Sequence, residues 1–376
     1  FDALHGVFDY YAACAEPNKD SAMSPSAFHQ FVTDCKLESK GSLGWDHERT
    51  DLLFAMVSCG GSNDFEDGWS GCSCCRSSRS ASLHEHVDEH VGEDRCFRVP
   101  GMLNRCEFLS AVVRLALMRF PSNVEIIDAS ESVEQFFIHL LLPRVPRHAL
   151  QDSNRFRNQC CYTYEVDKVL KYYEGTLKAL FTTFARRSRK QMTGELTELS
   201  CAGDAIDWKT WMAMLEVLDL FDEGFTRQEA TLCFVWCRML CVDDGTLAAK
   251  MKIDCIRWED FLEALVRMSM MMSLPSDAEI LHACALDAGE MMCTLKFFKP
   301  GDFDDFLESH PSRWRESHRL PNSSPKSVRH LITIIIRTVS FKAAQNQPGD
   351  RMPGGVLEQV TEEKLESLMD LEDGLQ

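Results

Sequence analysis

The stretch Met23-Ser-Pro-Ser-Ala-Phe28 decides the fold, because Ile206-Asp-Trp-Lys-Thr-Trp211 repeats its pattern much later in the chain. In both stretches an aliphatic residue ends a polar loop, and an aromatic residue follows five positions later. The same spacing recurs at residues 103–108 and 256–261. On either side of each stretch, apolar residues recur at i, i+3, i+4 and i+7, which indicates amphipathic helices. Two helix-loop-helix pairs, present twice along the chain, are typical of paired EF-hand modules.

This repeat predicts an all-α fold of two EF-hand-like four-helix modules in tandem, followed by a C-terminal helical extension. Module one takes residues 1–121 and includes a Cys/His-rich insertion at 58–102, which we expect to be flexible. Residues 122–160 form a linker helix followed by a basic linker. Module two takes residues 161–275, and residues 276–376 form the extension, which ends in an acidic amphipathic helix. We expect almost no β-strand.

The composition is that of a globular protein with substantial cores. The 376 residues are 45% hydrophobic and 26% charged, a balance that excludes collagen, coiled-coil and wholly disordered chains. No stretch approaches the roughly 18 apolar residues that a membrane span needs. The most apolar run, Leu331–Ile336, stops at Arg337, and we interpret it as a buried core segment.

The charge balance is strongly acidic, with a net charge of −18 and a pI of about 5.1. Such a field repels nucleic acid and anionic lipid over most of the surface, so we expect no membrane contact and disfavour a nucleic-acid partner. Many of the 17 cysteines occupy apolar helical positions, which indicates buried thiols in the reducing cytoplasm. Because the chain begins at Phe1 rather than Met, we expect a fragment that lacks N-terminal residues and any targeting signal they carry.

The loops of the repeat are poor calcium sites. A working loop needs oxygen ligands at positions 1, 3 and 5, Gly at 6 and Glu at 12. With the aliphatic residue at position 8, the first loop offers Glu16, Asn18 and Asp20, but Ser21 and Ala27 replace the Gly and the Glu. The other three loops lack oxygen-bearing side chains at the three ligand positions. We therefore predict structural hairpins, with the first loop as the candidate for a weak calcium site.

Module one resembles the core of the tubulin-polymerisation-promoting protein family. The residues that carry the resemblance are Phe8, Ala12, Met23, Phe28, Phe31, Asp34-Cys35, Asp51-Leu-Leu-Phe54, Glu107-Phe108, Ala111 and Arg119-Phe120. Module two follows this pattern more loosely. The resemblance implies an EF-hand-like helical core with degenerate loops, and a microtubule-associated or axonemal setting in a cilium or flagellum.

The insertion holds the sharpest candidate for a metal site. Its candidate zinc ligands are Cys72, Cys74, Cys75, His84, His86 and His90. These are ligand types that zinc prefers, but paired Cys-x-x-Cys knuckles are missing, so the alternative is a flexible insertion that binds no metal. We expect no other cofactor.

The sequence gives little reason to expect an enzyme. His86-Val-Asp-Glu-His90 matches an inverse zincin pattern, but the surrounding residues lack the apolar stripe of the core helix that this chemistry requires. No phosphate-binding glycine loop and no catalytic Ser/His/Asp or Cys/His arrangement stands out. We therefore predict no catalytic residues.

Two stretches are basic against this acidic background. Their candidate docking residues are Arg313, Arg315, Arg319, Lys326 and Arg329 in the first stretch, and Arg186, Arg187, Arg189 and Lys190 in the second. One interpretation is that the second stretch complements the dipole at the end of a helix. The other is that both stretches dock an acidic partner, such as the surface or tails of tubulin.

These observations favour a non-enzymatic structural scaffold. We expect it to bind tubulin or other cytoskeletal or axonemal proteins through apolar grooves and local basic patches. The methionine-rich run at 268–272 either lines such a groove or finishes a core helix, and the final acidic helix could fill a groove in its own chain or in another. The alternative function is a calcium-responsive EF-hand regulator with one weak site.

Overall fold

The computed structural model describes residues 2–15, 22–37, 46–58, 101–120, 128–191, 204–238, 254–311, 314, 324–345 and 357–373. Within these residues the chain is mostly helical, and the one sheet consists of two very short strands. The prediction of an all-α fold is therefore confirmed. A search of the described helices found none with the length and apolar character that a bilayer-spanning segment requires.

The chain divides into two compact units. Unit 1 contains the described residues up to Gln151, and unit 2 contains those from Asp152 onward. The boundary falls within residues 122–160, which we predicted as a linker, so the described part of this segment is divided between the two units.

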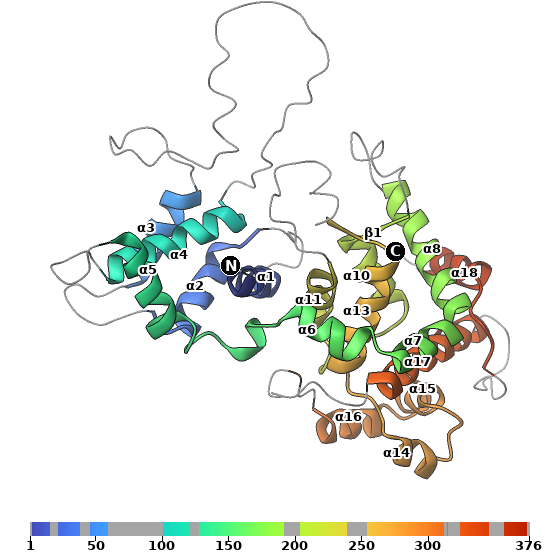
Figure 1. The fold of residues 1–376 in the computed structure, drawn as a ribbon. Coiled ribbons are helices and arrows are strands. Elements are labelled where there is room, and N and C mark those ends of the chain that lie inside the picture. Colours follow the sequence, from blue (N-terminus) through green and yellow to red (C-terminus); the bar gives the residue numbers. More distant parts are fainter. Residues whose placement is uncertain are drawn as a thin grey trace, which may run out of the picture. The chain divides into compact units, whose positions relative to one another are not determined.

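Unit 1 is a bundle of helices (Figure 1). Its helices are α1 (Asp2–Ala15), α2 (Pro25–Asp34), α3 (His47–Ser58), α4 (Arg105–Arg119) and α5 (Ala129–Phe136). A π-helical turn, η2 (Phe137–Leu141), extends α5, and a 3-10 turn, η3 (Arg147–Ala149), follows. Aromatic rings form the core, because the fully buried ring of Phe108 lies 5.6 Å from that of Phe8 and 5.2 Å from that of Phe31, centroid to centroid.

A short antiparallel bridge joins the starts of α2 and α4. The Met23 N–H donates to the Leu103 carbonyl at 2.8 Å, and the Leu103 N–H donates to the Met23 carbonyl at 2.9 Å. Both side chains are fully buried. Gly101 comes just before this bridge in the chain and has a φ of 73°, a left-handed conformation that favours glycine. The bridge therefore ties together two aliphatic residues that the repeat pattern had placed at equivalent positions.

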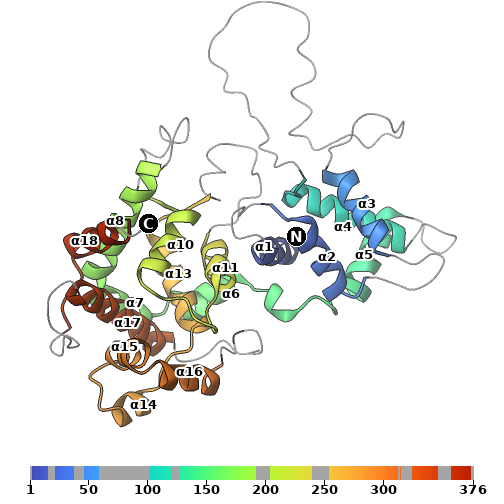
Figure 2. The same ribbon diagram turned by 180° about the vertical axis from the view of Figure 1, so that it is seen from behind.

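Unit 2 is larger and also helical (Figure 2). Its elements are α6 (Ser153–Phe156), the π-helical turn η4 (Arg157–Cys161), α7 (Tyr164–Tyr172), α8 (Glu174–Gln191), β1 (Ile206–Asp207), α10 (Trp208–Val217), α11 (Arg227–Cys237), β2 (Cys255–Ile256), α13 (Trp258–Met271), α14 (Asp277–His282), α15 (Ala288–Phe298), α16 (Pro300–Ser309), α17 (Ser324–Gln345) and α18 (Glu362–Asp373). The strands β1 and β2 pair antiparallel, with Ile206 opposite Ile256. This is the same pairing of aliphatic positions that unit 1 makes.

Helix α17 forms the centre of the C-terminal part of unit 2. Every residue from Leu331 to Val339 is buried, because α7, α13, α15 and α18 pack around the helix. The interpretation of Leu331–Ile336 as a buried core segment is therefore confirmed. The buried Arg337 donates from Nε and Nη2 to Asp287 Oδ2, at 3.1 and 2.7 Å, and so ties α17 to the start of α15.

A network of buried charges joins three segments of unit 2. Glu263 of α13 accepts hydrogen bonds from Arg157 Nε at 2.7 Å and from Arg267 Nη2 at 2.7 Å. Glu263 and Arg267 are almost completely buried, with 3% and 2% of their side chains exposed. Arg157 also donates to the carbonyls of Cys237 and Arg238 at the end of α11. The network therefore holds η4, α11 and α13 together.

Candidate functional site

The paired aliphatic residues of each unit are followed directly by a helix N-terminus. In unit 1, the hydroxyl of Ser24 accepts from the Ala27 N–H at 3.2 Å, and Asn104 Oδ1 accepts from the Glu107 N–H at 2.8 Å. In unit 2, Asp207 Oδ1 accepts from the Thr210 N–H at 2.7 Å. Side-chain caps of this kind satisfy backbone N–H groups that the first turn of a helix leaves without partners.

The last position of each loop is the one at which a calcium loop places its bidentate glutamate. Glu107 Oε2 instead accepts from the Asn104 N–H at 2.9 Å, and Asp260 Oδ2 accepts from the Arg257 N–H at 3.0 Å. The equivalent residues of the other two loops are Ala27 and Thr210. Burial raises the pKa of the Asp260 carboxyl, partly offset by the hydrogen bond from Arg257. The two carboxylates at this position therefore serve as helix caps.

Several predicted site residues lie outside the described residues. These are the calcium candidates Glu16, Asn18 and Asp20, the zinc candidates Cys72, Cys74, Cys75, His84, His86 and His90, and the docking candidates Arg313, Arg315 and Arg319. Lys190 lies in α8, but its side chain is outside the described part of the structure. The described docking candidates are Arg186, Arg187, Arg189, Lys326 and Arg329, all in unit 2.

Three of these described cations form ion pairs with carboxylates of the same chain. Arg186 lies 2.5 Å from Glu362 and 3.3 Å from Glu366, Arg189 lies 2.5 Å from Asp204, and Lys326 lies 2.5 Å from Asp277. The side chain of Arg329 is exposed on α17, and that of Arg187 is partly exposed on α8. Carboxylates of the same chain therefore already pair with Arg186, Arg189 and Lys326, and docking of an acidic partner by the basic stretches stays a prediction.

The final acidic helix, α18, accounts for the pairing of Arg186. It lies against α8 and α17 in both views of the ribbon and also contacts α10 (Figures 1 and 2). Its buried apolar residues are Val360, just before the helix, and Leu365, Leu368 and Met369 within it. An acidic amphipathic segment therefore already covers part of the second basic stretch.

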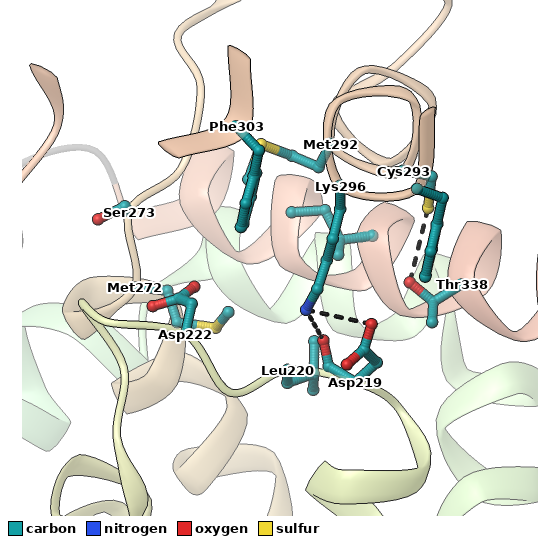
Figure 3. A pocket seen from close by; sticks show the side chains of 12 residues that line it. Asp219, Leu220, Asp222, Met272, Ser273, Met292, Cys293, Lys296, Phe303 and Thr338 are labelled. Carbon is teal, nitrogen blue, oxygen red and sulfur yellow. Dashed lines mark hydrogen bonds and ion pairs between the residues drawn. The ribbon is translucent and has the colours of Figure 1, made fainter. Parts of the chain in front are cut away.

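A small pocket opens between α15, α16, α17, the loop that connects α10 to α11, and the residues that follow α13 (Figure 3). Lys296 crosses it, donating from Nζ to the Asp219 carbonyl at 2.5 Å and lying 3.2 Å from Asp219 Oδ2. Met272 lines the pocket, whereas Met268 and Met271 are buried in the core. The methionine-rich run thus mainly completes a core helix, and its last member reaches this pocket.

Asp222 lines the same pocket, and the pKa of its carboxyl reflects how strongly the pocket disfavours a charge. Burial raises the pKa of the Asp222 carboxyl, and hydrogen bonds from Phe225 and Gly224 and the charge of Lys296 offset this only in part. A raised pKa in the folded state means that folding disfavours the carboxylate. This penalty is fully present at neutral pH, fades as the pH falls through the raised pKa of the folded state, and is gone below the unfolded value of about 3.9.

We expect Asp222→Asn, which keeps the accepting oxygen, to raise the free energy of unfolding at pH 7 by up to about 1 kcal/mol. The advantage should shrink towards pH 4. Urea unfolding at pH 7, 5.5 and 4 measures both effects. The control is Asp219→Asn, which removes the ion pair with Lys296 and should not stabilise the protein. A variant that is less stable than the parent at pH 7 would contradict this account of Asp222.

The structure also brings together three side chains that the sequence reasoning missed. His29 Nε2 of α2 lies 2.6 Å from Asp51 Oδ1 of α3, and the His29 and His47 rings lie 4.2 Å apart. The spacing of His47 and Asp51, four residues apart on one helix, was a signal that could have found them. A metal-bound imidazole usually donates its second N–H, but His29 Nδ1 is buried without a hydrogen-bond partner among the described residues. This geometry suits a hydrogen bond to Asp51 better than a metal ion.

Comparison of the chain with models of protein families, with curated proteins and with solved structures found no match.

Proposed function

We propose that the chain is a non-enzymatic scaffold of two EF-hand-like modules that hold protein partners in a microtubule-associated or axonemal assembly. The pairing of Met23 with Leu103 and of Ile206 with Ile256 supports the EF-hand-like interpretation, because paired aliphatic residues join the two loops of such a module. The microtubule setting rests on the family resemblance of module one.

One observation supports the proposal that calcium does not control the protein. The carboxylates at the last position of the loops serve as helix caps. Glu107 and Asp260 each accept a backbone N–H of their own helix N-terminus. One oxygen of each carboxylate is thus already engaged by the backbone, whereas a calcium loop uses both oxygens of its terminal glutamate for the ion. The hairpins are therefore proposed to keep their geometry through caps and buried apolar residues, without an ion.

Two features of the helices support the binding of protein partners. In unit 2, the surfaces of α7, α13 and α15 already hold an apolar helix, α17, in the same chain. In unit 1, several large apolar side chains are exposed, namely Leu52, Met56, Met118, Ile138 and Leu142. Exposed apolar side chains of this size are candidates for contact with a partner segment.

Two measurements on the full chain test the proposal. In isothermal titration with calcium, we expect no saturable heat up to millimolar concentrations, whereas the alternative regulator would bind in the micromolar range typical of calcium sensors. In cosedimentation with taxol-stabilised microtubules, we expect pelleting at low salt that weakens as salt screens the charges. Saturable calcium binding, or no pelleting at low salt, would overturn the corresponding part of the proposal.

A charge variant sharpens the cosedimentation test. Arg329 is exposed and belongs to a predicted docking stretch, so Arg329→Glu should weaken pelleting several-fold at low salt. Lys209→Glu makes the same change of charge at an exposed position outside both basic stretches and is the matched control. Equal losses in the two variants would show that net charge, and not this stretch, governs the interaction.

A further inference from the structure

The C-terminal segment 357–373 contains the acidic amphipathic helix α18, which packs against the rest of unit 2. It contains seven acidic residues and one lysine. Its apolar residues Val360, Leu365, Leu368 and Met369 are buried against unit 2. These residues cover a surface formed by α8, α10 and α17. We call this surface the α18-binding face.

Polar contacts fix the position of the segment on this face. Arg186 of α8 reaches two successive turns of α18, through Glu362 and Glu366. The Val360 N–H donates to Thr176 Oγ1 at 3.3 Å. Gly175 leaves room beside it, because a Cβ there would lie 3.2 Å from Gln359 Oε1. The face therefore holds a helix with an apolar stripe and with two acids, Glu362 and Glu366, one turn apart.

The charged contacts are exposed to solvent. The side chains of Arg186, Glu362 and Glu366 are 45%, 39% and 54% exposed, so each ion pair adds a modest part of the affinity, and salt screens it. The buried apolar residues hold the helix, and Arg186 sets its register and its preference for acids.

Helix α17 differs from α18 in this respect. It is enclosed by neighbouring helices and tied by the buried pair of Arg337 with Asp287. Helix α18 has one covered face, and its ion pairs lie at the surface. Segments with few buried contacts open at lower free-energy cost than the core of the same protein. We therefore expect α18 to detach from the rest of unit 2 at a lower free-energy cost than α17.

The geometry points to the α18-binding face as a docking site for acidic amphipathic helices of partner proteins. Helix α18 covers this face in the structure, so a partner helix must displace it. This inference rests on the proposed scaffold function and specifies one of its partner classes. An external helix binds only the fraction of molecules in which the face is open, so α18 lowers the apparent affinity by that fraction.

The test uses the full chain and a fluorescein-labelled peptide of residues 357–373, with binding followed by fluorescence anisotropy. In the Leu365→Ala variant the resident helix loses a fully buried side chain, so the peptide should bind at least about tenfold more tightly than it binds the parent chain. A peptide with its acids replaced by glutamine should bind about fivefold more weakly in low salt.

Two variants of surface residues control for effects on folding. Glu362→Lys removes a partner of Arg186, whereas Glu363→Lys makes the same charge change at the next residue, which is exposed. The peptide should bind the first variant more tightly than the parent chain and should bind the second as it binds the parent. Equal binding to all variants, or equal binding of the glutamine peptide, would overturn the inference. Failure of microtubule pelleting would instead count against the proposed function and leave this result unaffected.

Discussion

Replacing Glu263 by alanine should lower the free energy of unfolding by about 3–5 kcal/mol, the cost of leaving a buried charge without its partner. The carboxylate of Glu263 lies between Arg157 and Arg267, and the Arg267 side chain is only 2% exposed. Without Glu263, the Arg267 guanidinium keeps its burial and its place over the Phe156 ring but loses its counter-charge. Chemical denaturation of the full chain, followed by circular dichroism, measures the loss.

Two further variants separate the buried charge from general damage to α13. Glu259→Ala changes an exposed acid on the same helix and should alter stability by less than about 0.5 kcal/mol. The double variant Glu263→Leu with Arg267→Met replaces the pair by apolar side chains and should recover much of the stability. If Glu263→Ala costs no more than Glu259→Ala, the network does not hold α13 to η4 and α11 in the way described.

Replacing Gly289 by alanine should cost about 3 kcal/mol, near the upper end of the usual range for overpacking. An added Cβ would lie 2.2 Å from the Thr333 carbonyl oxygen and 2.7 Å from Arg337 Cγ. Because the closest atoms belong to the backbone of the buried helix α17, a side-chain rotation cannot relieve the clash. Helices α15 and α17 would have to separate, which would also disturb the pair of Arg337 with Asp287.

The matched control for this variant is Gly301→Ala in α16. An added Cβ there meets no atom within 4 Å, so the substitution should be neutral or should stabilise the helix by up to about 1 kcal/mol. Thermal unfolding of both variants beside the parent chain gives the comparison. A Gly289→Ala variant as stable as Gly301→Ala would contradict the close approach of α15 to α17.

The positions of the repeat helices could be predicted because their signals are local. Four helices begin within two residues of the aliphatic positions Met23, Leu103, Ile206 and Ile256. The apolar run of α17 was likewise evident as core. Within the predicted C-terminal helical extension, the chain turns after α14, where Cys284 has a φ of 53°. The apolar periodicity extended across this turn and gave no sign of it.

The contacts of charged residues could not be predicted in the same way. Arg186 meets Glu362 across 176 residues, and Arg157 meets Glu263 across 106. Apolar periodicity assigns charged residues to the surface by default. It therefore predicts neither the burial of the Glu263 network nor the surface on which α18 packs. The spacing of Glu263 and Arg267, four residues apart on one helix, indicated a pair but not its burial.

The bridge between Met23 and Leu103 has a consequence for engineering. It fixes the chain just after Gly101, and the packing of α3 on α4 fixes the chain at Ser58, so both anchor points of the intervening 59–100 stretch are set by unit 1 itself. The entropic cost of closing a loop grows only with the logarithm of its length. A change in the length of chain between these two anchor points should therefore alter the entropic cost of closing unit 1 only slightly.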